Sequence, residues 1–227
     1  MGDEEKHSNR RIDYIKSRLP QINNPMVVEI FGILLGDGWI GISGKPRLRK
    51  QVCFCGNLKS EVAYKTHIQK LLKIVFHVNG YYKKRDDYNT YYILINSETI
   101  FNFFHANFDF PICFKKSFNI YKFPKSWHLQ RSFIRGIFDT DGSTFFDHDR
   151  RYKRPYPVLD ITLKNTEVLD WLSEILNSYG FSTIRSGKWM RLKGSQNFNK
   201  WFKEIAPKNS IHMRKYSKWI TTYFSGS

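Results

Sequence analysis

Two apolar, glycine-containing segments that each end in Asp-Gly constrain the fold of this chain more than any other feature of its sequence. The first reads FGILLGDG and contains Gly32 and Gly36, and the second reads RGIFDTDG and contains Gly136 and Thr140. Small residues four positions apart lie on one face of a helix and allow two helices to pack backbone to backbone. We therefore predict that these four residues form the interface between two closely packed helices.

The aspartates at the ends of the two segments are expected to lie near each other. Asp37 and Asp141 are 141 − 37 = 104 residues apart, close to half of the 227-residue chain, which indicates an internal repeat. A carboxylate just after a helix lies at the negative end of the helix dipole, and two neighbouring carboxylates repel each other. A divalent cation would offset both effects, so we predict that Asp37 and Asp141 bind a hard metal ion. A single Asp-Gly would more simply be a turn, but two copies at this spacing favour a shared site.

The residues that follow each segment predict the same order of elements twice. Alternating and helically spaced apolar residues indicate α-β-β-α-β-β-α in each half. We assign residues 1–110 to an N-terminal half, 111–127 to a linker and 128–227 to a C-terminal half. The expected fold is α+β, with two halves related by a pseudo-twofold axis and with antiparallel sheets built from hairpins.

The charge of the chain indicates a polyanionic partner. The sequence has 37 Lys and Arg against 20 Asp and Glu, which gives a formal net charge of +17 at pH 7. Nucleic acid is the first candidate partner, and the alternatives are a structural RNA-binding role or an anionic membrane surface. No apolar run is long enough to cross a bilayer, so we expect no membrane-spanning segment.

The cysteines and the N-terminal segment indicate the compartment. Cys53, Cys55 and Cys113 match neither a disulfide framework nor a zinc-binding pattern. The N-terminal segment is charged and lacks the apolar stretch of a secretory signal. We expect free thiols in a reducing intracellular compartment, either the cytoplasm or an organelle matrix, and no secretion.

The repeated motifs also carry a family resemblance. IFGILLGDG and IRGIFDTDG resemble the paired signature of the LAGLIDADG homing endonucleases, in the single-chain form in which two fused halves imitate a homodimer. The resemblance extends over roughly residues 25–220, and YPVLDITLKNTEVLDWL is similar to the second-half pattern of intron-encoded members. The first motif departs from the family at Leu35, where an acid is often found, whereas the second keeps Asp139. The resemblance implies a monomeric enzyme that hydrolyses one phosphodiester on each strand of a long, asymmetric double-stranded DNA target.

The resemblance further implies an active site shared by the two halves. The acid before the final glycine of each motif, here Asp37 and Asp141, would bind metal. The backbone carbonyls of Gly36 and Thr140 would face the metal sites. Two or three Mg²⁺ ions would polarise the scissile phosphates and lower the pKa of an attacking water.

Basic or amide residues at the end of the second strand of each half complete the site in this family. Strand alternation places Lys164 on the face opposite Ile161 and predicts that it points toward DNA. Matching Phe54 with Ile161 places Asn57 at the equivalent position of the first half. We expect Lys164 to stabilise the transition state, Asn57 to orient water, and the two strands to be cut at unequal rates. A simple phosphate contact by Lys164 is the alternative.

Basic residues concentrate in the predicted hairpins, which suit the major groove of DNA. One face of each hairpin would contact DNA and the other would pack on helices. The candidates for base contact are Arg47, Arg49, Gln51, Arg154, Arg185 and Arg191, and the lysines expected on phosphates include Lys83, Lys84, Lys188 and Lys193. Further DNA-binding candidates are Arg85, Arg150 and Arg151. Because the hairpins of the two halves differ, we expect an asymmetric target and no need for a second protein chain.

The sequence alone leaves two other functions open. A maturase, or another DNA- or RNA-binding protein, could keep this fold and lack nuclease activity. A structural RNA-binding protein would depend on neither aspartate. The presence of both acids favours the nuclease.

Overall fold

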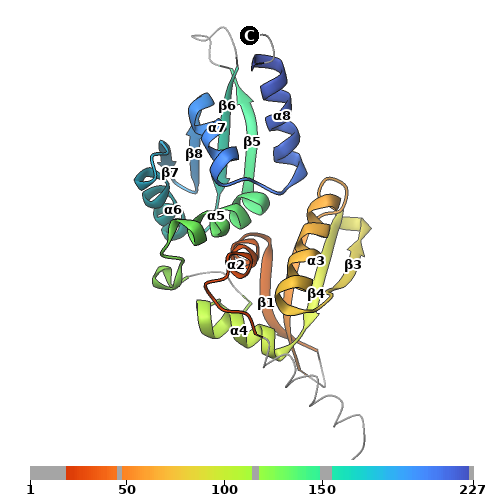
Figure 1. The fold of residues 1–227 in the computed structure, drawn as a ribbon. Coiled ribbons are helices and arrows are strands. Elements are labelled where there is room, and N and C mark those ends of the chain that lie inside the picture. Colours follow the sequence, from red (N-terminus) through yellow and green to blue (C-terminus); the bar gives the residue numbers. More distant parts are fainter. Residues whose placement is uncertain (1–18, 45–47, 114–117, 149–154, 225–227) are drawn as a thin grey trace, which may run out of the picture.

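Two halves with the same order of elements make up the structure, a computed structural model that describes residues 19–44, 48–113, 118–148 and 155–224 (Figure 1). The first half contains, in order, α2 (Pro25–Asp37), β1 (Gly38–Ser43), β2 (Arg49–Asn57), α3 (Val62–Phe76), β3 (Tyr81–Arg85), β4 (Thr90–Asn96) and α4 (Glu98–Phe108). The second half contains α5 (Trp127–Asp141), β5 (Gly142–Asp147), β6 (Tyr156–Thr162), α6 (Thr166–Ser178), β7 (Thr183–Ser186), β8 (Trp189–Lys193) and α7 (Gly194–Glu204), and α8 (Ser210–Phe224) follows it. Two 3₁₀ helices, η1 (Asp86–Tyr88) and η2 (Ile120–Lys122), lie in the β3–β4 turn and before α5. The predicted α+β fold and its α-β-β-α-β-β-α repeat are confirmed.

Each half is built on a four-stranded antiparallel sheet. The strand orders are β1-β2-β4-β3 and β5-β6-β8-β7. Gly38 pairs with Phe54 across β1 and β2, and Gly142 pairs with Ile161 across β5 and β6. The two sheets therefore share one register relative to the two motifs, as the matching of Phe54 with Ile161 predicted.

Strand β4 shows how the two faces of a sheet differ in this fold. In β4, Tyr91, Ile93 and Ile95 are buried, whereas the residues between them are only partly buried. This alternation follows from the period of two in a strand. It defines an inner face, which packs on the helices, and an outer face, which is available for a partner.

Helix α2 begins at a well-formed cap and is buried over most of its length. The Asn24 side chain accepts a hydrogen bond from the Met26 amide at 2.9 Å, and Pro25 occupies the first helical position. From Val27 to Leu35 every residue is buried. A helix buried on all sides lies inside a fold, which explains the nearly continuous apolar sequence.

Helices α2 and α5 pack directly on each other between the two halves (Figure 1). A Cβ atom on Gly32 would overlap the Phe133 carbonyl and lie 3.2 Å from the Gly136 Cα. A Cβ atom on Gly136 would lie 2.6 Å from the Ile33 nitrogen. Both distances are too short for ordinary contact, so the small residues are needed for the backbones to approach this closely.

The connection between the halves and the last helix pack onto this frame. Ile112 forms an isolated parallel bridge with Ile40, and Phe123 is buried. In α8, the ring of Trp219 stacks on Phe146 of β5 with 5.4 Å between centroids. Within the described ranges, the helices are all too short or too polar to cross a bilayer.

Candidate active site and nucleic-acid interface

The two predicted metal-binding aspartates lie at equivalent corners between a helix and a strand. Asp37 is the last residue of α2 and Asp141 is the last residue of α5. The next residue in each case, Gly38 or Gly142, has extended backbone and donates its amide hydrogen to the last turn of the helix. The chain therefore passes directly from helix into strand and holds each aspartate at the corner.

One cavity of about 670 Å³ brings the predicted residues of both halves together. Gly36 and Asp37 line it from the first half, and Asp141, Lys164 and Lys188 line it from the second. The rest of its lining consists of Leu35, Cys113, Phe118, Thr162, Leu163 and Asn165. Two acidic and two basic residues thus line one space at the boundary between the halves.

Close helix packing extends to the acidic ends of α2 and α5. A Cβ atom on Gly36 would lie 2.8 Å from Oδ2 of Asp141 and would overlap the Thr140 hydroxyl. The Thr140 hydroxyl itself donates to the carbonyls of Gly136 and Ile137, each at 3.0 Å. Gly36 is therefore the residue that lets the Asp141 carboxylate approach α2. Metal coordination by the Gly36 and Thr140 carbonyls stays a prediction.

The oxygen donors of the cavity suit a hard cation that takes its remaining ligands from water or from a substrate. Among the described residues there is no cluster of three or more His, Cys, Asp or Glu side chains that could hold a metal ion. The acidic donors in the cavity are Asp37 and Asp141. Mg²⁺ is commonly bound by one or two carboxylates together with water and substrate phosphates. The residues present therefore fit such an ion.

Lys164 and Asn57 occupy equivalent positions but have different surroundings. Lys164 lines the cavity. The side-chain oxygen of Asn57 instead accepts hydrogen bonds from the backbone amides of Lys59 at 3.0 Å and Ser60 at 2.9 Å. Asn57 thus closes the turn after β2, and the structure does not bring it to the cavity.

No protein-family model and no curated protein matches the chain. Solved structures do. Mesophilic variants of the homing endonuclease I-DmoI match with a TM-score of 0.57 at 17% identity, over 80% of this chain and 95% of that chain. I-SmaMI bound to an uncleaved DNA target in the presence of calcium ions matches with a TM-score of 0.57 at 14% identity, over 88% of this chain and 92% of that one. The chain has the fold of the single-chain LAGLIDADG homing endonucleases.

The likeness covers both halves. I-DmoI in complex with its target DNA and manganese matches over 89% of this chain and 94% of that chain, with a TM-score of 0.54 and 19% identity. At identities this low, the comparison establishes the LAGLIDADG fold, and the chemistry of this chain has to be argued from its own residues.

Strand register separates the predicted DNA contacts of this LAGLIDADG fold into two faces. The outer face carries the residues that alternate with Gln51 in β2 or with Asp160 in β6, together with the residues that pair with this set on neighbouring strands. The predicted contacts in this group are Arg49, Gln51, Lys83, Arg85, Arg191 and Lys193. Lys188 lies in the β7–β8 turn and lines the cavity. The predicted residues Arg47, Arg150, Arg151 and Arg154 lie outside the described residues.

Two predicted DNA contacts lie on the inner face instead. Lys84 pairs with the buried Tyr91, and Arg185 pairs with the buried Met190. Arg185 forms an ion pair with Asp170 of α6 at 2.9 Å. Both residues belong to basic hairpins, but the register places them on the inner face. Arg185 is held by α6 there, so it does not face the bases as predicted.

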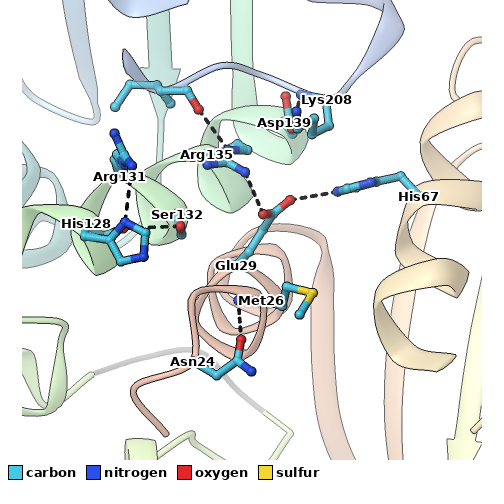
Figure 2. A network of polar contacts seen from close by, with 11 residues as sticks. Asn24, Met26, Glu29, His67, His128, Arg131, Ser132, Arg135, Asp139 and Lys208 are labelled. Carbon is cyan, nitrogen blue, oxygen red and sulfur yellow. Dashed lines mark hydrogen bonds and ion pairs between the residues drawn. The ribbon is translucent and has the colours of Figure 1, made fainter. Parts of the chain in front are cut away.

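A buried polar network, which the sequence analysis missed, links α2, α3 and α5 (Figure 2). Glu29 is 3% exposed. Its carboxylate contacts Nη1 of Arg135 at 2.9 Å and Nε2 of His67 at 2.7 Å, and Nε of Arg135 donates to the Ile205 carbonyl at 2.8 Å. The signal in the sequence was one acid within an apolar helix and one arginine within the other. The network ties three helices of the LAGLIDADG core to one another and to the residue that follows α7.

Asp139 is structural rather than part of the cavity. It is 1% exposed, and its Oδ2 accepts a hydrogen bond from the Lys208 amide at 2.7 Å (Figure 2). Its backbone carbonyl accepts from the Asn209 side chain at 2.8 Å. Burial raises the pKa of Asp139 to about 7, although the hydrogen bonds from Lys208 and Asn209 oppose the rise. Asp139 therefore anchors the segment between α7 and α8.

His212 spans the corner that carries Asp141. Its Nδ1 lies 3.1 Å from the Thr144 hydroxyl, and its ring packs on Phe138 with 4.4 Å between centroids. Burial lowers the pKa of His212 to about 4, and the nearby Lys215 lowers it further. The imidazole is therefore a neutral hydrogen-bonding group that connects α8 to both sides of the corner.

Proposed function

We propose that this protein is a metal-dependent, site-specific endonuclease that cuts both strands of a long, asymmetric DNA target. The observation that carries the proposal is the cavity in which Asp37 and Asp141 meet Lys164 and Lys188. A protein that only binds nucleic acid has no use for two carboxylates at its centre, because they repel phosphates. The LAGLIDADG fold and the basic outer faces of its sheets support the same function.

Divalent ions held by Asp37 and Asp141 would polarise the scissile phosphates and lower the pKa of the attacking water. We propose Mg²⁺ for this role, and the structures with this fold include I-DmoI complexes with magnesium, manganese or calcium. The two aspartates come from different halves, so each half would contribute one acid to the cleavage of the two strands.

Lys164 and Lys188 would act on the phosphates themselves. Both residues line the same cavity as the aspartates, and an ammonium group there can offset negative charge that develops on a phosphate during hydrolysis. Both come from the second half, and Asn57 is held in the turn after β2. The two half-sites are therefore chemically unequal, which supports the expectation that the strands are cut at different rates.

DNA would lie along the outer faces of the two sheets. These faces carry Arg49, Lys83 and Arg85 in the first half, and Arg191 and Lys193 in the second. Antiparallel ribbons of this kind fit the major groove, where each base pair presents a distinct pattern of donors and acceptors. Because one chain supplies both sheets, we propose that it acts as a monomer. We also propose that it works inside the cell and is encoded in an intron.

A cleavage screen tests this function. Fragmented DNA from the source of the protein is incubated with it in Mg²⁺ or in EDTA, and the ends produced are sequenced. The proposal expects paired breaks at one long, non-palindromic sequence in Mg²⁺ alone. Tight binding to a defined sequence, with no break in any divalent ion, would replace the endonuclease with a binding protein on this fold.

A further inference from the structure

The outer faces of the two sheets differ at one pair of equivalent positions close to the cavity. In the second half, Asp160 of β6 pairs directly with Arg191 of β8. In the first half, the matching pair is Cys53 of β2 and Leu94 of β4. Cys53 precedes Phe54, which pairs with Gly38, and Asp160 precedes Ile161, which pairs with Gly142. The two pairs therefore occupy equivalent positions relative to the two motifs. One pair is charged and the other is apolar.

The Arg191 side chain is held on two sides. Its Nε donates to Oδ2 of Asp160 at 2.5 Å, and its guanidinium carbon lies 4.5 Å from the centroid of the Trp189 ring. Asp160 is itself fixed, because it is 8% exposed and its Oδ1 accepts a hydrogen bond from the Thr162 hydroxyl at 3.0 Å. An arginine that is both ion-paired and stacked loses little conformational freedom when it binds a ligand.

This arrangement leaves the end of the Arg191 guanidinium available to a ligand. Because Nε is used by Asp160, the terminal Nη1 and Nη2 groups are the part of the fork that can reach a ligand, and neither makes a hydrogen bond to the residues that the structure describes. The Arg191 side chain is 35% exposed, whereas that of Asp160 is 11% exposed. The pair thus presents two parallel donors on a rigid support.

We infer that Arg191 reads a guanine in the major groove of the second half-site, and that Asp160 is its positioning residue. Two parallel N–H donors match the O6 and N7 acceptors of guanine, which no other base offers in the major groove. The inference rests on the proposed function, since it requires that the outer face of this sheet binds DNA.

The equivalent position of the first half-site is read differently. Leu94 carries no hydrogen-bond donor in its side chain, and an apolar side chain suits the C5-methyl group of thymine. The base pairs at this distance from the centre therefore differ between the two half-sites. This gives a residue-level reason for a target that is not a palindrome.

The main competing role for Arg191 is a contact to a backbone phosphate. A phosphate contact would weaken the binding of all sequences alike, whereas a base contact changes the preference at one position. The carboxylate of Asp160 also argues against a phosphate at this point, because it would repel one.

A binding selection separates these roles without requiring cleavage. The full chain selects from a random DNA duplex library in Ca²⁺ in place of Mg²⁺, and the bound duplexes are sequenced. Wild type is compared with Arg191→Lys, which keeps the charge but loses the fork, and with Asp160→Asn. The matched control is Asp170→Asn, which removes the partner of Arg185 on the inner face of the same hairpin.

The inference expects a wild-type consensus with one guanine that is preferred about tenfold or more over the other bases. Arg191→Lys should abolish that preference and leave the other positions of the consensus unchanged. Asp160→Asn should weaken it, and Asp170→Asn should preserve it. An unchanged guanine preference in Arg191→Lys, or a uniform loss of binding, would overturn the inference while a wild-type consensus still supports site-specific binding. The absence of any wild-type consensus would overturn both.

Discussion

Replacing Gly136 with alanine tests the close packing of α2 and α5 that brings Asp37 and Asp141 into one cavity. The added Cβ would overlap the Glu29 carbonyl oxygen and lie 2.6 Å from the Ile33 nitrogen, and ordinary contact begins at 3.4 Å, so the backbones must separate by at least about 0.8 Å (3.4 − 2.6). Overpacking of this kind costs about 1–3 kcal/mol. At an unhindered helix position the same change would stabilise by about 1 kcal/mol. We therefore expect a net loss in the free energy of unfolding.

The same separation should affect catalysis more than binding. A displacement approaching 1 Å at a reacting centre can slow the chemical step about 100-fold. The affinity for DNA depends on contacts spread over the two sheets and should change little. We expect the Gly136→Ala protein to cleave the strands about 10- to 100-fold more slowly than wild type at saturating protein.

The assay pairs urea denaturation with single-turnover cleavage of a labelled target. The control is Ser132→Ala in the same helix, which adds no atom and removes a hydroxyl 3.4 Å from the His128 carbonyl. A Gly136→Ala protein with wild-type stability and cleavage rate would refute the argument that backbone contact between the helices sets the geometry of the site.

Three further predictions concern the polar groups. Glu29→Gln should destabilise the fold by about 3 kcal/mol or more because it leaves the buried Arg135 charge uncompensated, and a double-mutant cycle with Arg135→Met should show strong coupling in urea denaturation. The raised pKa of Asp139, about 7, would by itself make stability fall by about 1 kcal/mol per pH unit from about pH 4 to 7, whereas the lowered pKa of His212, about 4, would by itself make stability rise by a similar amount up to about pH 6.5; the two effects should nearly cancel in the wild type, and Asp139→Asn should therefore convert a nearly flat profile into one in which stability rises from about pH 4 to 6.5 in urea denaturation. Lys164→Met should slow the cleavage of one strand more than the other, so nicked DNA should accumulate on a gel that resolves both strands.

The repeated motif made much of the fold accessible from sequence. The small residues Gly32 and Gly136 predicted the close helix pair. Because the Asp-Gly corner occurs in both halves, the order of strands and helices after it could be predicted for both. The register of the sheets also followed, because the residues that face the motif glycines, Phe54 and Ile161, could be matched by alternation.

Side-chain contacts that depend on tertiary geometry could not be predicted from the sequence. Whether Arg185 faces DNA or α6 depends on the turn that sets its pairing with Met190, and the basic composition of the hairpin does not reveal this. The contact between Glu29 and Arg135 depends on how α2 and α5 are rotated against each other. The side chain of Asn57 is used by its own turn, a local competition that strand matching does not detect.

The most direct test of the central claim compares Asp37→Asn and Asp141→Asn on the identified target with each strand labelled separately. The control is Asp109→Asn, an exposed acid in a left-handed conformation that asparagine also adopts. If the two acids form one metal-dependent site, both variants should still bind the target, and their double-strand cleavage should fall at least about 100-fold, while Asp109→Asn cuts like wild type. Double-strand cleavage at the wild-type rate by either Asp37→Asn or Asp141→Asn would contradict the account.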